Sequence, residues 1–243
     1  MALPSSPPIT LLQIKTEFGG GGEFNSYVRG GAYVPDSAAN AGIPTTAAGM
    51  RLLQFLGGSA FSPITHTYQT NGTSGTETIP SGATTVVIEV WGPSGSGGHG
   101  NNSGVGTIGG SGGSGGYSRS VYTVSGHAGA TMSYACGTGA TSNANVISGT
   151  FTITGMQCPT GGNGGNGTLT VGGGGGGAGP TGTGGNQLNS AGNAGAAGDP
   201  TGNGAAGAAV TGIHGTGKPG ALGTGINSGS NPGLTGTVVF YYT

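Results

Sequence analysis

The chain has 243 residues, of which 62 are glycine and 13 proline; only 5% are charged, and the formal net charge is −1. This charge gives no electrostatic footprint for nucleic acid or for an anionic membrane surface. No stretch approaches the roughly 20 apolar residues of a membrane span, and the first residues lack the basic and apolar regions of a secretory signal. We therefore expect a protein that is made in the cytoplasm, without membrane insertion and without nucleic acid as a partner.

Residues 1–60 are predicted to form a small helical module. Thr10 and Gln13 have the spacing of a capping box, and Gly19 supplies a stop signal for the helix that they begin. A second short helix is predicted over 50–57, where the pattern of the first is repeated. The apolar positions of these two helices are Leu11, Ile14, Phe18, Leu52 and Phe55.

Residues 61–243 carry the strand signals. The strongest is the β-branched run over 84–91, which is bounded by Gly82 and by Gly92-Pro93. The other predicted strands cover 67–69, 117–124, 131–136, 146–154 and 237–243. The expected fold class is mainly β, with little α-helix: the small helical module, then an antiparallel β-sandwich with long glycine-rich insertions.

The glycine-rich insertions are predicted over 92–116 and 160–236. In the second, glycine recurs at every third position for several stretches, which matches the three residues per turn of polyproline-II geometry. A strand follows at 237–243 and needs a partner earlier in the chain, so the two ends of the insertion should meet. This favours a bundle of polyglycine-II-like helices over a disordered low-complexity segment, and slips in the register disfavour collagen.

The first 60 residues resemble a short N-terminal module of tailed-bacteriophage tail proteins. The resemblance rests on an ordered set of short motifs, and Met50-Arg51 departs from it where serine is usual in the family. The matching positions are Leu3-Pro4, Ile9 to Leu11, Ile14, Glu17 to Gly19, Arg29-Gly30, Val34-Pro35, Ile43-Pro44 and Leu52 to Gly58. The resemblance implies that this module attaches the protein to the tail. The candidate attachment residues are the apolar positions of its two predicted helices, Leu11, Ile14, Phe18, Leu52 and Phe55.

A second resemblance begins at the run TIPSGATTVVIEVWGPSGSGG, residues 78–98. It is similar to a glycine-rich domain of phage tail proteins in which a strand ending in Trp-Gly passes into a glycine tract. The two resemblances together imply a virion protein that recognises the host surface through its glycine-rich domain. Its partners would be other tail or baseplate proteins and a carbohydrate or outer-membrane protein on the host. A homo-oligomer or symmetric copies in the virion would be expected.

Few residues are candidates for catalysis. His214 and Lys218 lie close in sequence, but no carboxylate pair or nucleophile–base spacing accompanies them. Cys136 and Cys158 have no metal-ligand spacing, and we expect both to be reduced. The sequence does not contain the phosphate-binding motif GxxxxGK[ST], in which a lysine follows the glycines. We therefore expect no enzyme activity, no cofactor and no metal.

Residues that interrupt the glycine period are the candidates for loop tips, where binding residues commonly lie. Asparagine and glycine also simply make good turns, so a purely structural interpretation stays open for each residue. The candidates are His99, Asn101, Asn102, Asn186, Gln187, Leu188, Asn189, Ile213, His214, Leu222, Ile226 and Asn227.

The sequence thus leads to a hypothesis of a bacteriophage tail adhesin. The alternative is a non-adhesive component of the tail tip, baseplate or collar, whose glycine-rich domain packs against neighbouring subunits. An ice-binding protein would also use glycine-rich helices, but it gives no place to the N-terminal module.

Overall fold

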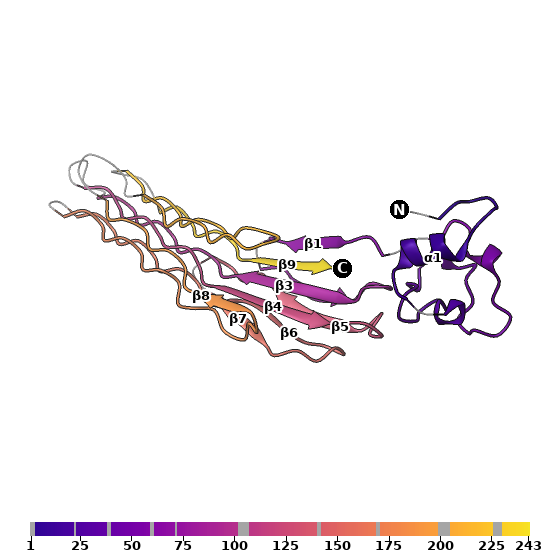
Figure 1. Cartoon of the computed structure of the whole chain (residues 1–243). Helices are drawn as coiled ribbons and strands as arrows, with labels where there is room; N and C mark the ends of the chain where they lie inside the picture. Colours follow the sequence, from indigo (N-terminus) through magenta and orange to yellow (C-terminus); the bar gives the residue numbers. More distant parts are fainter. Residues whose placement is uncertain are drawn as a thin grey trace.

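The computed structural model describes residues 3–21, 23–37, 40–58, 61–70, 72–101, 107–139, 142–168, 171–198, 205–225 and 230–243. The molecule is elongated. The N-terminal module lies at one end, a β-sheet body in the middle, and the glycine-rich segments extend from the body at the other end (Figure 1). Among the described residues, no helix has both the length and the apolar composition needed to cross a membrane.

The first sheet has five strands in the order β1-β9-β3-β4-β8, and each neighbouring pair is antiparallel. Its strand β3 contains the β-branched run that favours a pleated, half-buried surface. The final strand, β9, pairs with both β1 and β3, so the expected long-range partner exists. The strands are β1 (Ile64–Tyr68), β3 (Thr85–Trp91), β4 (Tyr117–Thr123), β8 (Leu188–Ser190) and β9 (Thr237–Tyr242).

The second sheet has four antiparallel strands in the order β2-β5-β6-β7. They are β2 (Ser74–Thr78), β5 (Thr131–Ala135), β6 (Ala144–Ser148) and β7 (Met156–Cys158). Strands β3, β4 and β9 of the first sheet approach β6 and β7 of the second, so the body is a two-layer structure. The prediction of a mainly β, antiparallel fold is confirmed.

The core of the body lies between the two sheets. Alternate residues of β3 and β9 point inward because successive side chains of a strand point to opposite faces. Together with residues of the facing sheet they form one buried cluster, which includes Val86, Ile88, Val90, Met132, Val146, Met156, Val238, Phe240 and Tyr242.

The structure differs from the sequence prediction at four strands. The strand expected over 146–154 ends at Ser148, because the Ser148 hydroxyl bonds the N–H and the C=O of Ile153 across a bend, both at 2.9 Å. Strands β2, β7 and β8 were not predicted, since none of them contains a β-branched apolar run.

The N-terminal module contains α1 (Leu11–Phe18), η1 (Phe24–Ser26) and η3 (Leu52–Phe55). The capping box of α1 forms as predicted, with the side chains of Thr10 and Gln13 each bonding the other residue's backbone N–H. The second predicted helix is wrong in extent: only the 3-10 turn η3 forms, and a positive φ at Gly57 follows it. The module has its own buried core of Leu3, Ile9, Ile14, Phe18, Tyr27, Val34, Ile43 and Phe55.

Candidate functional site

The glycine-rich segments lie side by side and are joined by backbone hydrogen bonds that recur every third residue. For example, the N–H groups of residues 92, 95 and 98 donate to the carbonyl groups of residues 116, 113 and 110, each at 2.8 Å. We call the whole set the glycine bundle. Its segments are 92–101, 107–116, 159–168, 171–180, 191–198, 205–209, 217–225 and 230–236.

Segment 107–116 is the centre of the glycine bundle. It has backbone hydrogen bonds with six other segments, and all its residues except Ile108 are buried. The two buried serine side chains of this segment accept hydrogen bonds from neighbouring segments. The Ser111 hydroxyl accepts the N–H of Gly223, and the Ser114 hydroxyl accepts the N–H of Asn193. Segment 107–116, which belongs to the insertion after β3, is therefore enclosed mainly by segments of the later insertion, which precedes β9.

The outer end of the glycine bundle follows from the hydrogen-bond register. Gly92 and Gly116 pair next to strands β3 and β4, whereas Asn101 and Thr107 pair at the other end of the same two segments. Thr107 also donates through its N–H and its hydroxyl to the carbonyl of Thr168, each at 3.0 Å. This end is directed away from the N-terminal module (Figure 1).

Two predicted binding residues, His99 and Asn101, do lie near this outer end. The N–H of His99 donates to the Asn166 side chain at 3.1 Å, which ties segment 92–101 to its neighbour. Asn102, Ile226 and Asn227 lie outside the described residues. The sequence analysis did not name Val171, which is 64% exposed here and whose N–H donates to the Thr168 hydroxyl at 3.1 Å.

Asn186 to Asn189 lie at the edge of the five-stranded sheet, and their prediction as loop tips is wrong. The Asn186 amide bonds the N–H and the C=O of Val121, both at 2.9 Å, as a neighbouring strand would. Residues 188–190 pair with β4 as strand β8. These side chains complete hydrogen bonding at the base of the glycine bundle, far from its outer end.

Ile213 and His214 also lie at the base, in a turn held on the outer face of the five-stranded sheet by Glu89. The fully buried Glu89 carboxylate accepts the N–H groups of Ile213 and His214, both at 2.7 Å, and the Tyr117 hydroxyl at 2.5 Å. The His214 ring stacks on Tyr241 with a centroid separation of 3.8 Å. His214 is therefore at the tip of a turn, but this turn lies on the sheet and not at the outer end of the glycine bundle. We call Glu89 and the turn over 211–216 the Glu89 latch.

Leu222 lies on the flank of the glycine bundle and is 50% exposed. Its carbonyl accepts the Asn231 side-chain amide at 3.0 Å, which joins segments 217–225 and 230–236. It borders a shallow apolar groove with Pro219, Pro232 and Leu234. Leu222 is therefore neither at the outer end nor at the base.

The residues predicted for attachment occupy two kinds of position in the N-terminal module. Ile14, Phe18 and Phe55 are buried in the core of the module, so a direct contact with another protein through them is excluded in this conformation. Leu11 is half-buried and Leu52 is 38% exposed. Among the described residues of the module, the large apolar side chains with the greatest exposure are Leu12 at 73% and Leu53 at 57%, which the sequence analysis did not select.

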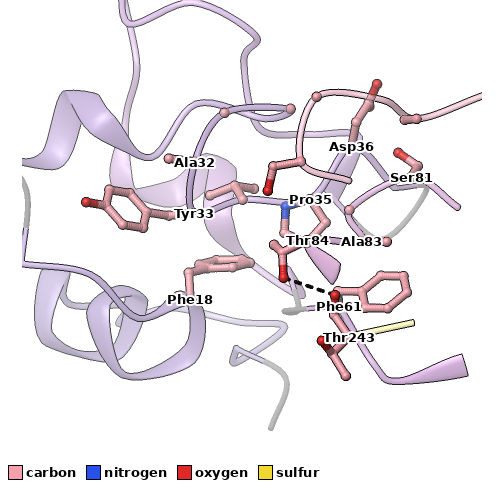
Figure 2. Close-up of a pocket in the computed structure, with 17 residues that line it drawn as sticks. Phe18, Ala32, Tyr33, Pro35, Asp36, Phe61, Ser81, Ala83, Thr84 and Thr243 are labelled. Carbon is pink, nitrogen blue, oxygen red and sulfur yellow. Dashed lines mark hydrogen bonds between the residues drawn. The ribbon is translucent and has the colours of Figure 1, made fainter. Parts of the chain in front are cut away.

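A cavity of about 660 Å³ lies where the module meets the body (Figure 2). Phe18 and Pro35 line it from the module, and Phe61, Ser81 and Thr84 from the body. Gly82 has a φ of +89°, and a Cβ at this position would lie 2.2 Å from the Cβ of Pro35. The segment of the body that contains Gly82 and the segment of the module that contains Pro35 are therefore in close contact beside the cavity.

The described residues contain no group of three or more His, Cys, Asp and Glu side chains that could hold a metal ion. Cys136 and Cys158 are both buried free thiols. Burial raises the pKa of the Cys136 thiol to about 11 and also raises the pKa of Cys158, so neither is a reactive thiolate at neutral pH.

No protein-family model matches the chain, and no curated protein sequence matches it either.

Proposed function

We propose that the chain is a structural protein of a bacteriophage tail and that it binds the host cell surface through the outer end of the glycine bundle. The N-terminal module, whose motifs resemble those of phage tail proteins, attaches it to the tail. The observation that carries this proposal is the enclosed segment 107–116. The bundle built around it extends away from the module (Figure 1), and Thr168 and Val171 lie beside Thr107 at its outer end.

The outer end is suited to binding because it combines a fixed support with exposed side chains. Backbone hydrogen bonds at every third residue join the segments to one another up to this end. Binding residues commonly lie on parts of a protein that such a scaffold positions. Val171 is exposed there, and the described residues Thr107, Asn166 and Thr168 supply uncharged amide and hydroxyl groups beside it. Such a surface suits a neutral carbohydrate or a loop of an outer-membrane protein.

The test compares two exposed apolar residues at opposite ends of the bundle. Labelled full-length protein is titrated onto a panel of bacterial strains, with Val171→Asp at the outer end and Leu188→Asp at the base. Both side chains are more than half exposed, at 64% and 51%. We expect Val171→Asp to weaken binding by about tenfold or more, equivalent to about 1.4 kcal/mol, and Leu188→Asp to leave it unchanged.

Equal loss in both variants would contradict recognition by the outer end. A folded protein that binds no strain but enters tails would instead support the alternative of a non-adhesive tail component. Attachment is tested separately by counting copies in purified tails. Leu12→Asp and Leu53→Asp should lower that count, whereas Leu188→Asp should not.

A further inference from the structure

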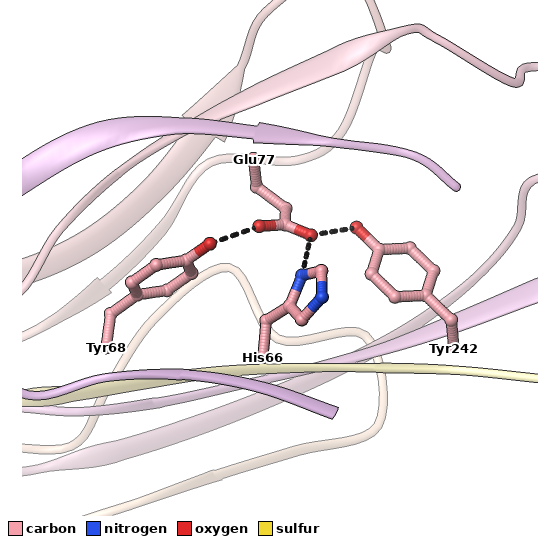
Figure 3. Close-up of polar contacts among 4 residues, drawn as sticks. All are labelled: His66, Tyr68, Glu77 and Tyr242. Atoms are coloured by element: carbon pink, nitrogen blue, oxygen red, sulfur yellow. Dashed lines mark hydrogen bonds and ion pairs between the residues drawn. The ribbon is translucent and has the colours of Figure 1, made fainter. Parts of the chain in front are cut away.

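A buried carboxylate at one edge of the body joins the two sheets. Glu77 belongs to β2 of the four-stranded sheet, and its side chain is only 3% exposed. It accepts hydrogen bonds from Tyr68 at 2.6 Å and Tyr242 at 2.9 Å, and its Oε1 lies 2.8 Å from Nδ1 of His66 (Figure 3). These three partners come from β1 and β9 of the five-stranded sheet.

Strand β1 depends on this contact more than the other strands of its sheet do. It is an edge strand whose single neighbour in the sheet is β9. The closest approach between the sheets involves β3, β4, β6, β7 and β9, not β1. Two of the three partners of Glu77, His66 and Tyr68, are on β1. Glu77 therefore ties an edge strand to the opposite layer.

The chemistry of the contact makes it sensitive to protons. The ionisable groups that face Glu77 are His66 and Tyr68 from β1, Tyr242 from β9, and Tyr134 from β5, whose ring stacks on Tyr68 at 4.0 Å. Burial and the nearby carboxylate raise the pKa of Tyr68 and Tyr242, so both hydroxyls stay donors. A carboxylate accepts from all of its partners, whereas a carboxylic acid must itself donate one hydrogen.

We propose that Glu77 is a proton-sensitive clasp that holds β1 to the four-stranded sheet and releases it when the carboxylate is protonated. Protonation of Glu77 also removes the negative charge that the partly exposed His66 ring faces at 2.8 Å, so this contact weakens as well. Because β1 is the first strand after the N-terminal module, its release lengthens the connection between the module and the body.

The proposal is tested by hydrogen exchange of the full-length protein at about pH 7 and about pH 3, two conditions chosen to compare the carboxylate with the carboxylic acid. After correction for intrinsic rates, we expect protection of the β1 amides to fall by about tenfold or more at the lower pH. The amides of β4, an interior strand of the same sheet, are the internal control and should keep their protection.

Glu77→Gln is the decisive variant because its uncharged amide cannot accept from all three donors at any pH. Its β1 amides should be weakly protected at both pH values. Tyr68→Phe is the substitute variant in case Glu77→Gln does not fold. It keeps the ring that stacks on Tyr134 and removes one hydrogen bond to Glu77, so it should lower the protection of the β1 amides at neutral pH. Equal β1 protection at both pH values in the wild-type protein, or an unchanged acid response in Glu77→Gln, would overturn the proposal.

Discussion

At the scale of single residues, the space available for one methyl group decides where the glycine bundle can form. A Cβ on Gly113 in the central segment would lie 2.1 Å from the carbonyl oxygen of Gly177. A Cβ on Gly177 would meet no atom within 4 Å. Of two glycines that face each other across the same contact, Gly113 has no space for a methyl group and Gly177 does.

We predict that Gly113→Ala destabilises the protein by about 1–3 kcal/mol or more, because the segments must move apart to admit the methyl group. Gly177→Ala is the matched control. It should be neutral or stabilise by about 0.4–1 kcal/mol, because alanine restricts the unfolded chain. Urea unfolding of both variants checks this, and equal free energies of unfolding would show that the central segment is not tightly enclosed.

At the scale of elements, the Glu89 latch fixes the glycine bundle to the five-stranded sheet. Glu89 and Trp91 are on the outer face of β3, and the turn over 211–216 covers them. A Cβ on Gly212 would lie 2.3 Å from the carboxylate of Glu89, and one on Gly217 would lie 2.6 Å from the Trp91 ring. Glycine thus allows the second insertion to return across the sheet before β9 begins.

Glu89→Gln should cost about 2–4 kcal/mol of unfolding free energy, because the amide nitrogen cannot accept a backbone N–H and leaves buried donors unpaired. Tyr117→Phe removes only one of the three hydrogen bonds and should cost about 1 kcal/mol. Amide exchange at Ile213 and His214 localises the effect. If those two amides stay protected in Glu89→Gln, the latch does not hold the turn.

At the scale of the whole molecule, the body contains tyrosines that the folded state keeps protonated. Burial is the largest cause that raises the pKa of Tyr68, Tyr117 and Tyr242, followed by a neighbouring glutamate in each case. A group whose pKa is raised by folding contributes stability below its unfolded pKa, and that stability is lost as the pH rises above it. In the unfolded chain these hydroxyls ionise at about pH 10.

We therefore predict that stability falls progressively above about pH 10 and that these tyrosines ionise together with unfolding. Tyrosinate absorbance and circular dichroism followed in one titration should change in the same step for this set. Complete ionisation of all tyrosines while native circular dichroism persists would contradict the prediction.

The sequence was informative where a signal is local. The β-branched run of β3 predicted a strand, and the spacing of Thr10 and Gln13 predicted a capped helix, because both depend on neighbours within a few residues. The mainly β, antiparallel class followed from several such runs. The short strands β2 and β8 were missed because their pairing with distant strands, not their own composition, makes them strands.

The sequence by itself determined the mainly β fold class and the capped start of the helix in the N-terminal module, because both depend on patterns among neighbouring residues. Only the tertiary structure decided which segment lies at the centre of the bundle and which residues reach its outer end. Asn186 and His214 interrupt the glycine period as a loop tip would, yet they lie against the sheet. The physical reason is that every segment offers similar N–H and C=O groups every third residue, so the pairing is settled by contacts far apart in the chain.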